Sequence, residues 1–165
     1  SPRNQKQKDD TMKIQWKTLI GNLIIPLAVG ALAGFFTRNA MDSYQELQQP
    51  PLAPPSVLFP IVWTTLFILM GISAYLVSVS GDGGRYTLPK LYWVQLVVNF
   101  LWPFIFFNLG MYLAAFLWLI LLIALVIAMI AKFYQISHAA AYLQIPYLLW
   151  LIFAGYLNLG ILLLN

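Results

Sequence analysis

Tryptophan and carboxamide side chains are the most distinctive chemical groups in this apolar sequence. Trp63, Trp102 and Trp150 stand inside long apolar segments, and Asn99 and Asn158 stand near two of them. Indole rings offer a large flat contact surface, and amides both donate and accept hydrogen bonds. These groups suit contact with a ligand as well as packing between helices. The residues alone leave core packing equally open for the tryptophans, and they favour bridging between helices for the two asparagines.

The sequence lacks the groups that hydrolysis, thiol chemistry or coupled transport would need. It has no cysteine, and its one histidine, His138, falls in a predicted loop, so we expect no metal site and no cofactor. No Asp, Glu, Lys or Arg lies well inside an apolar segment, whereas ion-coupled transporters keep such residues in the membrane. Neither coupled transport nor acid–base hydrolysis is expected.

The composition indicates an integral membrane protein. Of the 165 residues, 61% are hydrophobic and 8% are charged, and the mean hydropathy is +0.79, whereas a soluble domain carries about 25% charged residues. Apolar segments of roughly 20 residues predict transmembrane helices. We therefore expect a polar tail over residues 1–15 and then one all-α domain over residues 16–165. Its five transmembrane helices are predicted at residues 16–37, 56–78, 90–107, 112–133 and 140–164.

Positive charge gathers at one end of this predicted bundle. The N-terminal tail and the second and fourth loops hold eight of the nine Lys and Arg residues, and the first loop holds Arg38. The positive-inside rule therefore predicts a cytoplasmic N-terminus in a bacterial cytoplasmic membrane, with the first loop outside. Met12 resembles a natural start, so part of residues 1–11 is expected to be foreign, and no cleavable signal peptide is expected.

A proline-rich run leads from the first loop into the second apolar segment. Residues 50–55 read Pro-Pro-Leu-Ala-Pro-Pro, and proline fixes φ and lacks an N–H. We expect this run, called the strap below, to be stiff and extended at the outer end of the bundle. By the helical rise, Trp63, Trp102 and Asn158 fall roughly 8 to 10 Å beneath that end.

Three stretches of the chain resemble the TspO/MBR family, the translocator proteins once called peripheral-type benzodiazepine receptors. Residues 43–71 are similar to the family's WY-x-x-L-x-K-P-x-W-x-P-P…VW-x-x-LY-x-x-MG region. Residues 95–107 resemble its L-N-x-x-W-x-x-x-F-F segment, and residues 145–165 resemble its P-Y-x-x-W-x-x-F-A-x-x-L-N ending. The resemblance covers all five segments in order, and it is typical of a bacterial member.

The resemblance implies a five-helix bundle with a hydrophobic pocket that the first loop covers. Family members bind tetrapyrroles such as protoporphyrin and haem, and also benzodiazepine or isoquinoline carboxamide drugs. By motif position, Asn99 and Asn158 would be polar supports of the pocket. The remaining wall would consist of Phe35, Phe59, Val62, Trp63, Trp102, Ile105, Leu109, Trp150, Ala154 and Leu157.

Charged and iron-binding groups refine this expectation. Arg38 is the one cation expected on the outer side, so it is a candidate partner for the propionates of a porphyrin. Haem iron would need an axial ligand, and His138 is expected at the opposite side. We therefore expect free-base porphyrin to bind at least as well as haem.

The sequence also departs from the family pattern. Ser43 and Leu52 stand where tryptophans are usual, Gln49 replaces a lysine, and Pro60 and Phe67 replace a glycine and a tyrosine. The first loop is therefore expected to hold ligands differently. The cholesterol motif of animal members is missing from the given sequence, so cholesterol is not an expected ligand.

Three functions stay open at this stage. The first is a membrane receptor or carrier for tetrapyrroles and similar apolar ligands. The second is an enzyme-like, light-dependent degradation of protoporphyrin, which some bacterial family members are reported to perform with tryptophans that match Trp63 and Trp150. The third is a facilitative channel or scaffold without a specific ligand. The lack of an encoded general acid, base or metal favours the first over the second.

Contacts outside the pocket are expected as well. Family analogy favours a homodimer, and the small residues Gly110, Ala114 and Ala115 would allow close packing of a second copy. Trp118, on the fourth segment, is expected to face lipid or a subunit contact.

Overall fold

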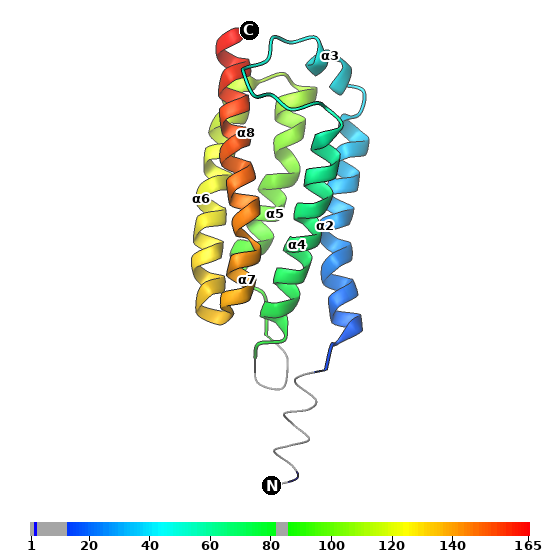
Figure 1. Ribbon diagram of the computed structural model, residues 1–165, viewed down its shortest axis with the longest axis vertical. Helices are drawn as coiled ribbons and strands as arrows, with labels where there is room; N and C mark the ends of the chain where they lie inside the picture. Colours follow the sequence, from blue (N-terminus) through cyan, green and yellow to red (C-terminus); the bar gives the residue numbers. More distant parts are fainter. Residues whose placement is uncertain (1, 3–12, 82–85) are drawn as a thin grey trace.

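The computed structural model describes residues 2, 13–81 and 86–165, and within these ranges the chain is helical and contains no strand (Figure 1). Two short helices, α3 (Met41–Gln45) and α7 (His138–Leu143), accompany the long ones. The long helices are α2 (Trp16–Thr37), α4 (Leu58–Ser78), α5 (Lys90–Pro103) with its π-helical continuation η2 (Phe104–Asn108), α6 (Tyr112–Ile136) and α8 (Ile145–Leu164). Five helical spans are long and apolar enough to cross a membrane, the last formed by α7 and α8 together. The predicted all-α membrane bundle is confirmed.

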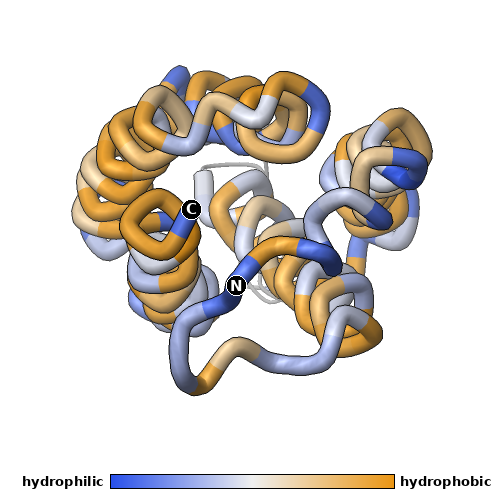
Figure 2. The backbone as a smooth tube through the Cα atoms, turned by 90° about the horizontal axis from the view of Figure 1, so that it is seen from above, coloured by the Kyte–Doolittle hydropathy of each residue, from blue (hydrophilic) through white to orange (hydrophobic). Residues whose placement is uncertain are grey.

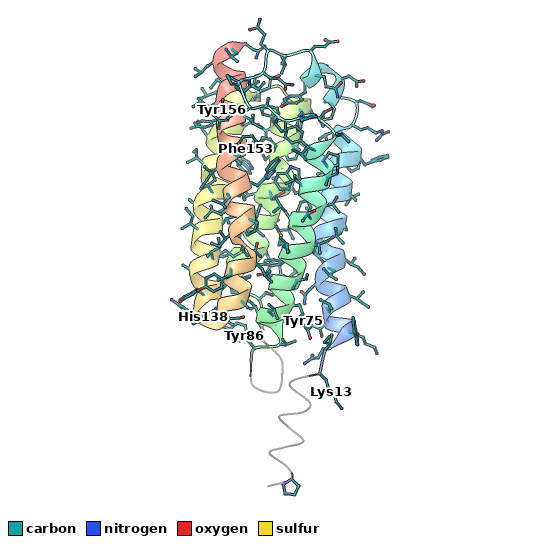
Figure 3. All side chains as sticks on the ribbon, viewed as in Figure 1. Lys13, Tyr75, Tyr86, His138, Phe153 and Tyr156 are labelled. Carbon is teal, nitrogen blue, oxygen red and sulfur yellow. The ribbon has the colours of Figure 1, made fainter. Side chains whose placement is uncertain are left out.

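The helices alternate in direction, so the connections gather at two ends. The first loop with α3 lies at one end, beside the C-terminus, and we call it the first-loop end (Figure 1). Lys13, Tyr86 and His138 lie at the opposite end, which we call the lysine end (Figure 3). Seen along the bundle, apolar residues predominate on the helices (Figure 2). Residues 1 and 3–12 of the tail predicted over residues 1–15, and Arg85 of the second loop, lie outside the described residues.

The fourth connection is shorter than expected. Helix α6 runs on to Ile136, one turn beyond the predicted end at residue 133, and only Ser137 separates it from α7. The Ser137 hydroxyl accepts a hydrogen bond from the backbone N–H of Ala140 at 3.3 Å, so it caps the new helix. The predicted loop over residues 134–139 was therefore wrong, because a single serine cap allows the chain to start a new helix without a longer connection.

Two glycines let α2 and α4 pack closely. Pro26 lacks an N–H, so the carbonyl of Asn22, one turn earlier in α2, has no helical donor. A Cβ atom on Gly71 of α4 would lie 2.8 Å from that carbonyl oxygen. Closer to the first-loop end, a Cβ atom on Gly30 would lie 2.5 Å from the ring of Phe67. Neither position has room for a side chain, so both glycines set the distance between the helices.

The strap is bent, which differs from the predicted extended run. The backbone N–H of Ala53 donates to the carbonyl of Pro50 at 3.2 Å, and Leu52 has a φ of +70°. A proline in the second position and a positive φ in the third are typical of a type II turn. Leu52 is 83% exposed, so the turn projects its side chain away from the bundle.

The strap docks against the C-terminal half of α8. Pro50 is buried, and a Cβ atom added to Gly160 would lie 2.5 Å from its ring. The hydroxyl of Tyr156 donates to the carbonyl of Pro51 at 2.6 Å. These contacts hold the turn on one side of the first-loop end.

A pair of hydrogen bonds precedes the strap. The side-chain amide of Asn165 accepts from the backbone N–H of Gln48 at 3.2 Å and donates to its carbonyl at 2.9 Å. The backbone N–H and the backbone carbonyl of Gln48 are both satisfied by the Asn165 side chain. The first loop is therefore attached to the residue that follows α8 before the prolines begin.

Candidate functional site

An apolar cavity of about 720 Å³ lies in the half of the bundle nearer the first-loop end. Helices α2, α4, α5, α6 and α8 all contribute to its wall. Three indole rings line it: Trp63 from α4, Trp102 from α5 and Trp150 from α8. Its volume falls within the range of about 300–1,000 Å³ that is usual for small-molecule pockets.

The structure brings most of the predicted ligand-binding residues to this cavity. Val62 instead packs against the main hydrophobic core, Ile105 packs against the smaller cluster around Tyr44, and Leu109 is 64% exposed. In the π-helix, Phe106 and Phe107 line the cavity where Ile105 was expected. The predicted residues that do line it number ten: Phe35, Arg38, Phe59, Trp63, Asn99, Trp102, Trp150, Ala154, Leu157 and Asn158.

The cover of the cavity comes from α3. Met41 and Tyr44 of this short helix line the cavity, whereas none of the described residues 48–57 does so. The Tyr44 ring lies 5.3 Å from that of Phe107 and 6.3 Å from that of Phe59. Burial raises the pKa of the Tyr44 hydroxyl above its ordinary value, so this group stays neutral.

The contribution of α3 to the cavity wall was not predicted from the sequence. The available signal was Tyr44, the second residue of the first family-like stretch. The strap lies beside the cavity and attaches the first loop to α8.

The rings of Trp63 and Trp150 meet edge to face across the cavity wall. Their centroids lie 6.5 Å apart at an interplanar angle of 87°. Trp63 also stacks on Phe67 at 5.6 Å, and Trp150 meets Phe59 at 5.9 Å. These ring contacts, one stacked and two edge to face, hold the indole rings of Trp63 and Trp150 against their neighbours in the cavity wall.

Trp102 is held by a hydrogen bond from another helix. Its indole N–H donates to the Oδ1 atom of Asn158 at 3.3 Å, and its ring stacks on Phe106 with centroids 5.1 Å apart. The Nδ2 atom of Asn158 donates to the carbonyl of Tyr112 at 2.9 Å. Asn158 therefore bridges α8 to α5 and α6, and its amide positions the Trp102 ring.

Asn99 also bridges helices. Its Nδ2 atom donates to the hydroxyl of Tyr147 at 2.6 Å, and that hydroxyl donates to the Oε1 atom of Gln95 at 2.8 Å. The interpretation of both asparagines as bridges between helices is confirmed. Asn99 nevertheless lines the cavity, so this bridge forms part of the cavity wall.

Arg38 supplies the charge at the cavity. It is the one charged side chain among the described residues that line the wall. Its guanidinium carbon lies 3.8 Å above the centroid of the Phe35 ring, and its NH1 atom donates to the Phe35 carbonyl at 2.6 Å. Arg38 is exposed, so one end of the apolar cavity carries an accessible cation. His138 lies at the lysine end, with its ring stacked on Tyr134 at 4.2 Å (Figure 3).

Outside the pocket, two residues expected to contact lipid or a second copy have contacts within the chain. The indole N–H of Trp118 donates to the carbonyl of Val98 at 2.8 Å, and its half-buried ring packs against the core, so its polar edge faces α5. Ala115 is fully buried within the chain and is not available to a second copy. Gly110, with a φ of +63° in the turn before α6, is exposed and Ala114 is half-buried, so close packing of a second copy at these two positions stays a prediction.

Comparison with known proteins agrees with the resemblance. The TspO/MBR family matches residues 22–164. The Tryptophan-rich protein TspO of Archaeoglobus fulgidus is 37% identical over 150 residues, which are 89% of this chain and 96% of that protein. Protein CrtK of Rhodobacter capsulatus is 37% identical over 138 residues, 82% of this chain and 85% of that protein. The Translocator protein of Bos taurus is 34% identical over 147 residues, 87% of each chain.

Proposed function

The chain belongs to the TspO/MBR family, and on that premise we propose that it is a membrane receptor or carrier for tetrapyrroles such as protoporphyrin and haem. Benzodiazepine and isoquinoline carboxamide drugs would occupy the same cavity. The observation that carries the proposal is the apolar cavity of about 720 Å³ with three indole rings in its wall.

The chemistry of the wall matches a flat macrocycle with acidic side groups. Indole rings provide broad apolar contact and offset stacking for a π-system. The propionates of a porphyrin need a cation, and Arg38 offers its guanidinium where the cavity meets the surface. His138 lies at the lysine end, so free-base protoporphyrin is expected to bind at least as well as haem (Figure 3).

Tryptophan fluorescence in detergent tests this proposal. Protoporphyrin should quench the emission saturably, and Trp102→Ala should weaken binding at least tenfold, because the indole contributes wall surface. Trp16→Phe is the matched control, since it also removes one indole, from a side chain that is 62% exposed and stands outside the cavity wall. Equal affinity for protoporphyrin in the two variants would contradict the proposal that this cavity is the binding site.

A second function is favoured by one contact. Trp63 and Trp150 lie edge to face with centroids 6.5 Å apart, and both line the cavity, so a porphyrin bound there would lie beside both rings. Light-dependent degradation of protoporphyrin should therefore slow strongly in the double variant Trp63→Phe and Trp150→Phe. If the double variant degrades protoporphyrin under light at an unchanged rate, the two rings serve only in packing.

We also propose that the protein lies in a bacterial cytoplasmic membrane with its lysine end in the cytoplasm. The support is the placement of Lys13 at the end opposite the first loop (Figure 3). The chain has no cysteine, so single cysteines report orientation directly. In intact cells, an impermeant thiol reagent should label Ser43→Cys and spare Gln135→Cys. The reverse pattern would overturn the orientation.

A homodimer is proposed from the family relationship alone. Light scattering with the detergent mass subtracted should give twice the chain mass of 18.7 kDa. A value equal to one chain would contradict the homodimer.

A further inference from the structure

The half of the bundle nearer the lysine end buries an unusual set of polar side chains. Five of them are at most 1% exposed: Ser73, Tyr92, Gln95, Gln144 and Tyr147. All stand within or beside helices that are apolar enough to span a membrane. A buried polar group in such a bundle has no bulk water to satisfy it, so it must find a partner inside the protein.

Some of these groups do find partners. The Tyr147 hydroxyl joins Asn99 to Gln95 through hydrogen bonds of 2.6 and 2.8 Å. The Ser73 hydroxyl donates to the carbonyl of Ala140 at 2.7 Å. Since Asn99 also lines the cavity, this network begins at the cavity wall and leads toward the lysine end.

The polar atoms of Tyr92 and Gln144 have no such partners among the described residues. The hydroxyl of Tyr92 and both polar atoms of the Gln144 amide are buried, with no hydrogen-bonding partner among the described residues. Three buried polar atoms without partners are costly, and native proteins usually satisfy such atoms with internal water. An amide with two unused polar atoms has both a donor and an acceptor to offer.

The helix register places Tyr92 and Gln144 at the same depth. Helices α5 and α8 both run from the lysine end to the first-loop end (Figure 1). The hydrogen bond between Gln95 and Tyr147 aligns them. Tyr92 precedes Gln95 by three residues and Gln144 precedes Tyr147 by three, so each lies about 4.5 Å closer to the lysine end on the same helical face.

The neighbours of this layer are apolar and partly small. The Tyr92 ring stacks on Phe133 at 6.2 Å. Ala140 and Ala141 belong to the same buried cluster and add little volume beside it. Tyr92 and Tyr147 belong to this cluster as well, which connects the layer to the hydrogen-bonded network of Tyr147.

We propose that Tyr92 and Gln144 form a binding site for internal water. One or two water molecules there complete the hydrogen bonds of the two side chains. Together with Tyr147, Gln95 and Asn99, they form a hydrogen-bonded file from the cavity wall toward the lysine end. The inference concerns the ligand-free protein and does not depend on which molecule the cavity binds.

X-ray footprinting of the ligand-free protein in ¹⁸O-labelled water tests the site. Hydroxyl radicals form from bound water and oxidise the side chains beside it, so Tyr92 should be oxidised several-fold more than Phe133. Phe133 is the matched control, because it is equally buried and stacks on Tyr92 but has no polar atom. Equal labelling of the two rings would overturn the proposal.

A double-mutant cycle provides a second readout. Tyr92→Phe and Gln144→Leu each remove one partner of the water, so the loss of melting temperature in the double variant should be clearly smaller than the sum of the single losses. Strict additivity would show that no shared molecule links the two groups. If a variant fails to fold, the footprint of the unmodified chain still decides the question.

Discussion

The two halves of this bundle consist of the same helices and similar apolar residues, but they are packed differently. Near the lysine end, Met70, Val77, Met129 and Phe133 are completely buried, and they share one core cluster with buried alanines. Near the first-loop end, three indole rings held by ring contacts surround a cavity of about 720 Å³. Fixed rings occur in both halves, so the difference lies in what surrounds them: small and flexible side chains pack against the rings near the lysine end, whereas the indoles near the first-loop end border open space.

Replacing one phenylalanine by alanine in each half should show the difference in packing most clearly. Phe133→Ala removes a fully buried ring from the solid half and should cost about 3–5 kcal/mol of unfolding free energy. Phe59→Ala enlarges a space that already exists, so it should cost clearly less and instead weaken ligand binding. Thermal unfolding in detergent measures both. Equal losses of stability would mean that the two halves are packed alike.

The crossing of α2 and α4 gives the next largest effect. In Gly71→Ala, the new methyl group would meet backbone atoms of α2 at 2.8 and 2.9 Å, so the helices must separate at a cost of about 1–3 kcal/mol. Gly21→Ala on α2 is the control, because a Cβ atom there meets nothing within 4 Å. A drop in melting temperature for Gly21→Ala as large as that for Gly71→Ala would contradict the account of this crossing.

The hydrogen bond to Trp102 should matter for both stability and binding. Asn158→Leu keeps the side-chain size but leaves the indole N–H and the Tyr112 carbonyl without their partner. We expect a loss of about 1–3 kcal/mol in stability and a weaker affinity for protoporphyrin. Unchanged affinity would show that the orientation of the Trp102 ring does not control binding.

The smallest effect is expected at the strap. Tyr156→Phe removes one exposed hydrogen bond to Pro51, which should cost about 0.5–1.5 kcal/mol or less and leave ligand affinity unchanged, because the strap does not line the cavity. The measurement is a melting curve with and without protoporphyrin. A large loss of affinity would show that the strap, and not α3 alone, covers the cavity.

The sequence predicted the spans well because hydropathy is a local property of the chain. The first helix begins and ends at the predicted residues 16 and 37, and the others begin within two residues of the prediction. The exceptions depend on single contacts. Ser137 caps α7 and shortens the fourth connection, and the positive φ of Leu52 bends the strap.

The details of the candidate site were harder to predict because they depend on tertiary contacts. The π-helix rotates Phe106 and Phe107 toward the cavity in place of Ile105. Trp118 turns inward because the Val98 carbonyl accepts its indole hydrogen. No local pattern in the sequence indicates either arrangement.

Filling the cavity tests the central claim most directly. Ala154 is buried and lines the cavity, whereas Ala124 on α6 is exposed and stands outside the wall, so Ala154→Leu and Ala124→Leu add the same volume in different places. Titration with protoporphyrin, followed by tryptophan quenching, should show at least a tenfold loss of affinity for Ala154→Leu and no change for Ala124→Leu. Full affinity in the Ala154→Leu protein would contradict the assignment of this cavity as the ligand site.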